Sequence, residues 1–227
     1  MLVTFYGHGC FNVEVNGIHL LFDPFITPNE KANHIDINSI PADYILISHG
    51  HEDHIADVKR IAERTNATLI SNFEIISWFD KNFGVGNGHP MNHGGSWNFP
   101  FGKVKYVNAI HSSTLPDGSS GGNPGGFIVE TAKKSFYYAG DTALHMDMKL
   151  IGEYHHIDFA LFPIGDNFTM GYEDASIAAE MVKTKTVVGL HYDTFGFIEI
   201  DHDKARETFK KKNINLLLPM IGEEINL

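Results

Sequence analysis

Three histidines and two acidic residues are concentrated in the run 49–54, which reads His-Gly-His-Glu-Asp-His. Neutral imidazole and ionised carboxylate are preferred ligands for zinc-like divalent ions. His49 and His51 are two residues apart, so on extended chain their side chains point the same way. Asp53 and His54 follow as the chain enters an expected helix, where they can face a second ion. A solvated histidine-rich loop is the alternative, but tags of that kind are repetitive and terminal, whereas this run is internal and mixed.

Three further residues of ligand type follow apolar, strand-like stretches downstream. Taken singly, a His or Asp at a strand end is usually a cap or a turn residue. Together with the first run they make a set large enough for two ions that share a bridging water. The candidate ligands are His49, His51, Asp53, His54, His111, Asp141 and His191.

Strand and helix patterns alternate along the chain and position these residues. Period-two apolar stretches predict strands, and Asn16-Gly17 is a hairpin turn. Asn72 is the expected N-cap of a helix. In the first half we expect strands at 2–6, 11–15, 18–22, 44–48 and 68–71, and helices at 55–65 and 73–83. In the second half we expect strands at 104–110, 127–130, 135–139, 157–162 and 186–190, and a helix at 172–183.

The second half repeats the order of the first, so we read two similar β-rich halves with helices on one side of each. Packing the two sheets together with the helices outside gives an α/β fold, a four-layer αββα sandwich, in one domain spanning 1–227. Chance similarity of generic α/β segments is the alternative. The segments 84–98 and 112–126 are rich in Gly, Ser, Asn and Pro and are expected to be loops. The second begins after His111 and should rim the site, although both could be plain surface linkers.

Composition narrows the classes of function. The chain has 227 residues, 43% of them hydrophobic, and one cysteine, Cys10. It has no bilayer-length apolar run and no basic leader, so we expect a cytoplasmic protein without membrane contact. The formal net charge of −11 argues against a broad nucleic-acid-binding face. The oligomeric state is not predicted.

At this point the sequence resembles the metallo-β-lactamase superfamily, through the run 49–54, His111, Gly140-Asp141-Thr142 and His191 in the family order. Within it, the segments 7–11, 163–171 and 191–195 are similar to small bacterial metal-dependent hydrolases related to ascorbate-6-phosphate lactonase. A carboxylate at Asp141, where some true β-lactamases use cysteine, argues against antibiotic hydrolysis. His51 stands where flavodiiron oxidoreductases carry a carboxylate, which disfavours a redox di-iron site.

The resemblance implies a role for each ligand. His49, His51 and His111 would hold one ion. Asp53, His54 and His191 would hold a second, with Asp141 as the bridge. Two divalent ions are expected, with zinc favoured by the histidines and manganese or iron admitted by the carboxylates. A hydroxide bridging the ions would be the nucleophile, and Asp53 is the candidate to orient it and carry the proton to the leaving group.

Four residues outside the ligand set have two open interpretations each. Asp23 either accepts a hydrogen bond from a metal-bound imidazole or is a turn carboxylate before Pro24. His8 either reaches the site mouth or is a structural polar residue. Asn167 and Thr169 either bind substrate or cap a loop.

These features predict a hydrolase acting on a small, anionic ester, lactone or phosphoester. The alternatives are a non-catalytic metal-binding or sensing module and a phosphodiesterase or nuclease of the same fold. A complete ligand set with the bridging Asp141 favours the enzyme. Sequestering a metal requires no open coordination position, whereas the arrangement that the resemblance implies keeps one.

Overall fold

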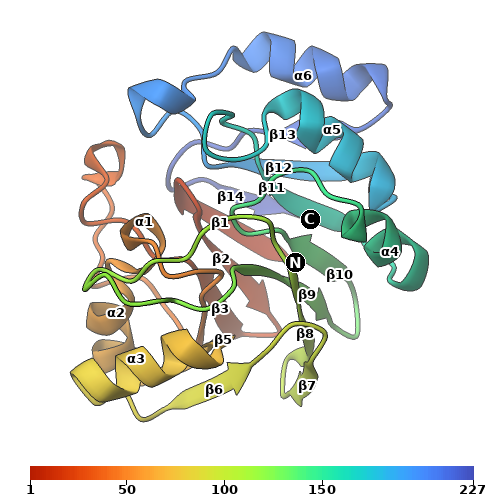
Figure 1. The fold of residues 1–227 in the computed structure, drawn as a ribbon. Coiled ribbons are helices and arrows are strands. Elements are labelled where there is room, and N and C mark those ends of the chain that lie inside the picture. The colour runs from red at the N-terminus through yellow and green to blue at the C-terminus, as the bar shows by residue number, and fades with distance from the viewer.

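The computed structural model describes residues 1–227 and contains two seven-stranded sheets (Figure 1). In the first sheet the neighbours run β14-β1-β2-β3-β4-β5-β6. Its strands are β1 (Leu2–Gly7), β2 (Cys10–Val15), β3 (Ile18–Phe22), β4 (Tyr44–Leu46), β5 (Thr68–Asn72), β6 (Gly88–Met91) and β14 (Glu224–Asn226). From β3 to β6 neighbouring strands are parallel, so their carboxyl ends lie at one edge of the sheet.

The second sheet has the order β13-β12-β11-β10-β9-β8-β7. Its strands are β7 (Ser96–Phe99), β8 (Gly102–Asn108), β9 (Gly125–Glu130), β10 (Ser135–Tyr138), β11 (Phe159–Pro163), β12 (Thr186–Leu190) and β13 (Asn215–Leu217). The strands β10 to β13 are parallel to one another, as β3 to β6 are in the first sheet. Both sheets therefore present a row of parallel strand ends.

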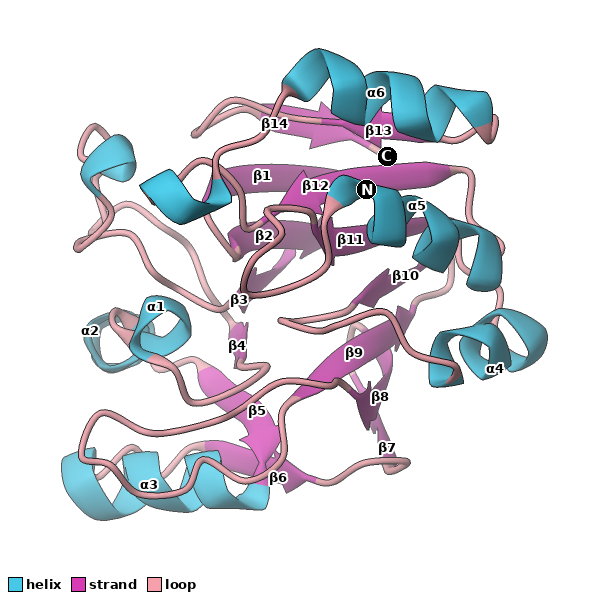
Figure 2. Cartoon of the chain, turned by 45° about the horizontal axis from the view of Figure 1, so that its top comes forward, coloured by secondary structure: helices cyan, strands magenta, loops and turns pink.

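Helices cover the outer face of each sheet (Figure 2). The first sheet is covered by α1 (Glu52–Ile55), α2 (Val58–Thr65) and α3 (Phe73–Phe83), and the second by α4 (Asp147–Tyr154), α5 (Tyr172–Met181) and α6 (His202–Lys211). Two short 3-10 helices, η1 (Glu30–Ala32) and η2 (Gly196–Ile198), lie in the connecting loops. A cluster of 21 buried hydrophobic residues fills the space between the sheets, and one further cluster lies under each helical layer. The expected four-layer αββα sandwich is confirmed.

Several elements match the bounds that local sequence signals predict. Asn16 and Gly17 both have positive φ, at 52° and 80°, as the hairpin turn between β2 and β3 requires. The Asn72 side chain accepts a hydrogen bond from the Ile75 amide at 2.9 Å, so α3 begins at the expected cap. These contacts are local, which is why the sequence pattern alone predicts them.

The expected helix over 55–65 is confirmed over most of its length, but it begins later, because α2 starts at Val58 and is separate from α1. Asp57 interrupts them, with φ −103° and ψ 1°. Its carboxylate accepts hydrogen bonds from the amides of Ile26 at 2.7 Å and Thr27 at 2.8 Å. This tertiary contact with a distant loop holds Asp57 out of the helical conformation.

The expected loop 84–98 is also wrong in part, because it contains β6 and the start of β7. Each pairs with a more regular strand, β6 with β5 and β7 with β8, and that pairing overrides the Gly- and Asn-rich composition. The strand expected over 44–48 is shorter, because β4 ends at Leu46. The sequence pattern did not reveal α4, α6, β13 or β14.

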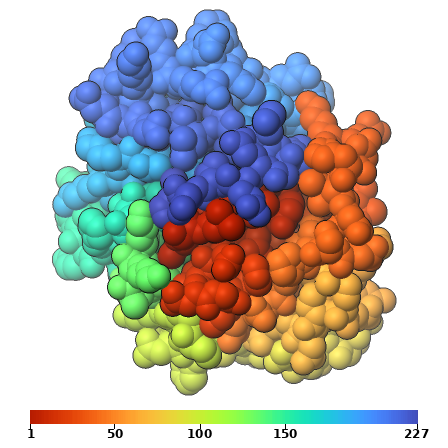
Figure 3. Space-filling view, turned by 180° about the vertical axis from the view of Figure 1, so that it is seen from behind, coloured from red at the N-terminus to blue at the C-terminus, as the bar shows by residue number.

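One strand from the C-terminal end of the chain joins the first sheet. β14, near the C-terminus, pairs antiparallel with β1 of the first sheet, with Val3 opposite Ile225. Figure 3 shows the dark blue C-terminal residues lying against the red N-terminal ones on this face. None of the helices is long and apolar enough to cross a membrane.

Candidate metal centre

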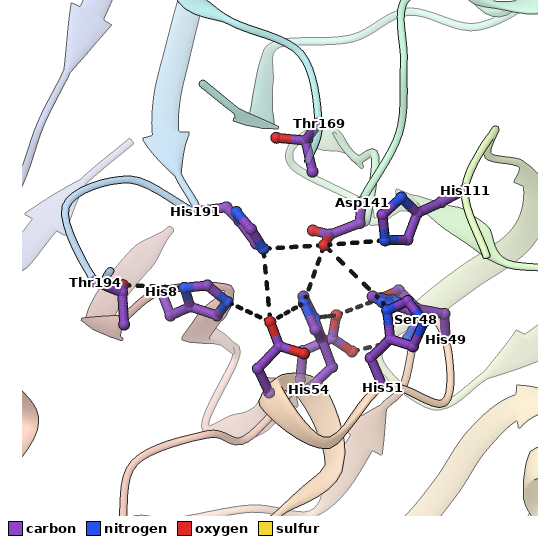
Figure 4. Close-up of polar contacts among 12 residues, drawn as sticks. His8, Ser48, His49, His51, His54, His111, Asp141, Thr169, His191 and Thr194 are labelled. Atoms are coloured by element: carbon purple, nitrogen blue, oxygen red, sulfur yellow. Dashed lines mark hydrogen bonds and ion pairs between the residues drawn. The ribbon is translucent and has the colours of Figure 1, made fainter. Parts of the chain in front are cut away.

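The candidate ligands come from both halves and meet at the edge where the parallel strands end (Figure 4). In open α/β sheets, ligands commonly bind outside the carboxyl ends of the strands. In the first half, the run 49–54 lies just beyond β4 and enters α1. In the second, His111 follows β8, Asp141 follows β10 and His191 directly follows β12. The site therefore lies across the seam between the two sheets.

The first cluster consists of His49, His51 and His111. One ligand atom from each lies within 4.8 Å of the others. His49 Nε2 is 2.9 Å from His51 Nδ1. His49 is fully buried, while the His111 side chain is 15% exposed. Three imidazoles that converge from one side in this way can hold a zinc-like ion.

The second cluster consists of His8, Asp53, His54 and His191, whose ligand atoms also lie within 4.8 Å of one another. Asp53 Oδ2 is 3.8 Å from His54 Nε2 and 3.7 Å from His191 Nε2. Of the two interpretations of His8, the position at the site mouth is wrong, because the side chain is buried. Its Nε2 lies 2.9 Å from Asp53 Oδ2, which is compatible with the structural polar role.

Asp141 faces both clusters with one oxygen. Its Oδ2 lies 3.9 Å from His49 Nε2 and 3.7 Å from His111 Nε2 on one side. On the other side it lies 3.3 Å from His54 Nε2 and 3.0 Å from His191 Nε2. A single carboxylate oxygen that faces four imidazoles is placed to be shared between two cations.

The residues present fit divalent ions. His54 Nε2 is buried and makes no hydrogen bond. Its other ring nitrogen, Nδ1, is held by Asp23 Oδ2 at 2.7 Å. Buried polar atoms are normally hydrogen-bonded, so an orphaned one requires an explanation. A cation ligated by Nε2 provides it, and the donor set of imidazoles and carboxylates is the kind that zinc and manganese take.

The electrostatics differ between the two clusters. Burial lowers the pKa of His49, His51 and His111, so these rings are neutral and free to bind a cation at neutral pH. Burial also disfavours charge on His54 and His191, but the Asp141 carboxylate outweighs it. The pKa of His54 is raised well above its usual range, and that of His191 is raised to about 9. The carboxylates therefore stabilise positive charge on His54 and His191, whereas burial lowers the pKa of His8 in the same cluster to about 4.

Asp23 forms hydrogen bonds with the candidate ligand His54 and with residues around it. Its Oδ2 accepts hydrogen bonds from His54 Nδ1, from the Ser48 hydroxyl and from the Tyr138 hydroxyl, the last at 2.6 Å. Its Oδ1 accepts the Ser48 amide at 2.8 Å. Asp23 thus orients the candidate ligand His54. Both of its oxygens already accept hydrogen bonds, so its role is to support a ligand. Its φ of 40° turns the carboxylate inward.

Three residues of the candidate site have strained backbone conformations. His8, Asp23 and His191 all have positive φ, at 54°, 40° and 55°. Non-glycine residues rarely adopt this conformation, and it persists where the surrounding structure fixes it. Here the three residues lie among the polar side chains at this edge of the sheets.

The loop 112–126 rims the first cluster, as expected. The Ser113 hydroxyl accepts a hydrogen bond from the Gly50 amide at 3.0 Å. The Ser112 hydroxyl is 3.3 Å from His51 Nε2. The loop therefore contacts the run 49–54 directly rather than being a plain surface linker.

Two expected substrate residues lie apart from the ligands. Asn167 is exposed, and the Thr169 hydroxyl donates to the Met170 carbonyl at 3.3 Å. Neither makes a hydrogen bond to a cluster residue. Their role toward substrate stays a prediction.

Sequence reasoning missed three supporting residues: Ser48, Tyr138 and Thr194. Ser48 directly precedes His49, and its hydroxyl lies 2.9 Å from His49 Nδ1, so adjacency could have revealed it. Thr194 lies 3.0 Å from His8 Nδ1 and belongs to the His191 segment. Tyr138 comes from the opposite sheet, and no local signal connects it with Asp23.

Comparison with known proteins gives three concordant similarities. Residues 2–191 match the model of the beta-lactamase superfamily domain. A protein of Christiangramia forsetii named metal-dependent hydrolase is 54% identical to this chain over 229 residues. One of the same name in Flavobacterium johnsoniae is 55% identical over 227 residues, and each comparison covers 100% of both chains. A metallo hydrolase of the archaeon Ignicoccus hospitalis, 32% identical, superposes with a TM-score of 0.87 over 99% of this chain and 97% of that one.

Proposed function

The chain belongs to the metallo-β-lactamase superfamily, and from this premise we propose that it is a metal-dependent hydrolase with two divalent ions. The observation that carries the proposal is Asp141, whose Oδ2 lies within 3.9 Å of imidazole nitrogens from both clusters. A site for a single ion would use only one of the two clusters and would leave the other unexplained. The names of the relatives support hydrolysis.

The proposed assignment gives each cluster one ion. His49, His51 and His111 would hold the first, and Asp53, His54 and His191 the second, with Asp141 between them. Zinc suits the histidine-rich first position, and the carboxylates admit manganese or iron. Bound there, two ions would supply Lewis acidity, which lowers the pKa of water toward about 7 and polarises a substrate oxygen.

Asp53 is the candidate to orient the attacking water. Its side chain is 29% exposed, while the side chains of Asp141 and Asp23 are 4% and 0% exposed. It is therefore the carboxylate of the centre that a solvent molecule can reach. A carboxylate within reach of the water can accept its hydrogen bond and pass a proton to the leaving group.

The substrate side of the site includes an aromatic ring. Phe195 is 40% exposed, and its ring centroid lies 5.4 Å from that of His8. An exposed aromatic beside a polar centre is typical of ligand sites, where apolar walls surround a few polar groups. We propose a small ester, lactone or phosphoester with an anionic group drawn to the ions and an apolar part against Phe195.

A substrate panel tests the proposal. Zinc- or manganese-loaded protein is offered a p-nitrophenyl ester, a lactone, a thioester and bis(p-nitrophenyl) phosphate, with Asp141→Asn as the matched control. Hydrolysis of at least one substrate by the native chain, and none by the control, is expected. Two bound ions without turnover of any substrate would favour a sensing module instead. Efficient cleavage of RNA or DNA would favour the nuclease alternative, which the net charge of −11 disfavours.

A further inference from the structure

We propose that a cavity beside α6 is a second ligand site, which takes a small organic anion with a carboxylate or phosphate group on an apolar body. The cavity has a volume of about 630 Å³ and lies between α6 and the segments 31–34, 192–194 and 218–221. Pockets for small molecules commonly measure about 300–1,000 Å³. The proposal goes beyond the proposed function, because it requires no hydrolysis.

The cavity is separate from the candidate metal centre. None of the residues assigned above as metal ligands lines it. The two sites share a wall that contains His8 and Thr194, whose side chains are joined by a 3.0 Å hydrogen bond. A molecule in the cavity therefore faces this wall and does not face the candidate ligands.

Arg206 of α6 is the main argument for an anion. The chain has three arginines. Arg60 donates a hydrogen bond to the Asn38 side chain at 3.0 Å, and Arg64 donates one to the Ile40 carbonyl. Arg206 lines the cavity and makes no hydrogen bond or ion pair. A guanidinium presents its N–H donors in a planar fork that fits carboxylate and phosphate oxygens, so Arg206 is free to bind such a group.

Positive side chains exceed negative ones around the cavity. Lys31 and Arg206 line it, and Asp193 is the only carboxylate that does. Asp193 is already engaged, because its Oδ2 accepts a hydrogen bond from His202 Nε2 at 2.6 Å and its Oδ1 accepts one from the Ile200 amide at 3.0 Å. This local excess is opposite in sign to the formal net charge of −11. The cavity therefore favours an anion over a metal cation.

Tyr192 adds a hydroxyl donor to the same cavity. The residue is buried, and its hydroxyl makes no hydrogen bond with another protein group. Burial raises the pKa of Tyr192 well above its usual range, and the Asp193 carboxylate acts in the same direction. The Arg206 guanidinium opposes this rise, because it lies close enough to stabilise the phenolate. At neutral pH the hydroxyl therefore keeps its proton and can donate a hydrogen bond to an anion beside Arg206.

Apolar side chains form another part of the lining. Phe5 is buried, Leu218 is half-buried and Met220 is exposed. Sites for small molecules typically combine apolar walls with a few polar groups that fix orientation. The ligand should therefore have an apolar body, such as a ring or a short acyl chain, and place its charged group between Arg206 and Tyr192.

Nuclear magnetic resonance of the zinc-loaded chain tests the proposal with two anions that cannot be hydrolysed, phenylacetate and phenylphosphonate. The methionine methyl groups are labelled isotopically, because Met220 lines the cavity. Met170 reports on the metal centre, since its amide donates to the carbonyl of Thr142, next to Asp141, at 3.0 Å. Benzyl alcohol is the uncharged comparison.

Each ligand is titrated into the native chain, Arg206→Gln, Arg206→Lys and Arg60→Gln. Arg60→Gln is the matched control, because it removes the same charge from an exposed position on α2. Arg206 is also exposed, so its replacement should leave the fold intact. The methionine spectrum of each free variant checks this.

We expect the Met220 resonance to shift and saturate with at least one anion and not with benzyl alcohol. Arg206→Gln should weaken this binding about 10-fold or more, as the loss of a hydrogen bond to a charged group usually does. Arg206→Lys should weaken it less, because the charge remains, and Arg60→Gln should match the native chain. The tighter of the two anions distinguishes a carboxylate ligand from a phosphate ligand.

Four results would overturn the proposal: no saturable shift of Met220 with either anion, equal binding of benzyl alcohol, unchanged affinity in Arg206→Gln, or shifts confined to Met170. The last would mean that the anions bind at the metal centre instead. Failure of the proposed function is distinguishable, because neither anion is a substrate and the measurement requires no turnover.

Discussion

The hydroxyl of Tyr138 donates a 2.6 Å hydrogen bond to Asp23 Oδ2, and this bond joins the end of β10 in the second sheet to the end of β3 in the first. Both residues are fully or almost fully buried. The same carboxylate oxygen accepts His54 Nδ1 at 2.7 Å. One acidic residue therefore connects the packing of the two sheets with the orientation of a candidate metal ligand.

A pair of variants can separate the contribution of Asp23 to sheet packing from its contribution to the orientation of His54. Tyr138→Phe removes one hydrogen bond to a charged group and should lower the free energy of unfolding by about 1.5–3 kcal/mol, with both ions retained. Asp23→Asn should cost more and also weaken the second ion, because the carboxylate that orients His54 is lost. Urea unfolding and metal analysis measure the two effects. Loss of an ion in Tyr138→Phe would contradict the separation.

Asp141→Asn should reduce the metal content from about two ions to at most one. The amide removes the negative charge that lets two cations lie close together, so one cluster is left with weaker attraction for its ion. Elemental analysis after reconstitution with zinc measures this, and circular dichroism should show a folded protein. Full metal content with full activity would mean that the bridging assignment is wrong.

Gly9→Ala should disturb the second cluster through a direct clash. A Cβ at Gly9 would lie 2.9 Å from His54 Cε1, closer than real Cβ contacts. We expect a loss of about 1–3 kcal/mol in unfolding free energy, as overpacking usually gives, and weaker binding of the second ion. Gly86→Ala is the control, since its Cβ would meet nothing within 4 Å. Equal behaviour of the two variants would contradict the expected clash.

Asn72 has two separable roles, which Asn72→Ala and Asn72→Asp distinguish. Its Oδ1 caps α3, and its Nδ2 donates to the Gly121 carbonyl at 2.7 Å in the loop that rims the site. The alanine variant loses both bonds, while the aspartate variant keeps the cap. Thermal unfolding should show that the free energy of unfolding of the alanine variant is lower than that of the aspartate variant by about 1 kcal/mol. Activity should fall in both variants, because both lose the hydrogen bond that holds the loop. Full activity in either variant would show that this contact with the loop is not needed for catalysis.

Phe195→Ala should raise KM and leave kcat and metal content nearly unchanged. The ring is 40% exposed and lies beside His8, so it can contact substrate without ligating an ion. Phe83→Ala is a control of similar size, since Phe83 is 38% exposed at the end of α3. Steady-state kinetics on the best substrate of the panel measures KM and kcat of both variants, and only Phe195→Ala should show a higher KM. A fall in kcat alone would place Phe195 in the chemical step instead.

Local signals in the sequence predict much of the fold. The bounds of β3, α3 and β12 follow from a hairpin turn, an Asn N-cap and an apolar run, each of which acts within a few residues. What they cannot predict is tertiary. The break between α1 and α2 depends on the bonds of Asp57 to a loop some 30 residues away in sequence. The pairing of β14 with β1 depends on the whole sandwich.

The candidate site, like the fold, can be predicted from the sequence only in part. The residue types and order of the ligands are visible in the sequence, and the structure brings all of them together at one edge. Their supports are not visible, because Tyr138 and Thr194 act through contacts between elements that are distant in the chain. Hydroxyl groups are also common on any surface, so their type alone carries no signal. Whether the assembled residues bind two ions stays a prediction.

The order of the ligands along the chain has a consequence for biosynthesis. The imidazoles of the first cluster are all present once His111 has left the ribosome, whereas the second cluster extends from His8 to His191. His111 follows β8, however, and most of the second sheet, with Asp141 and His191, is translated later. Because domains generally fold as units, both positions should be completed together, only after the strands that carry Asp141 and His191 have been translated.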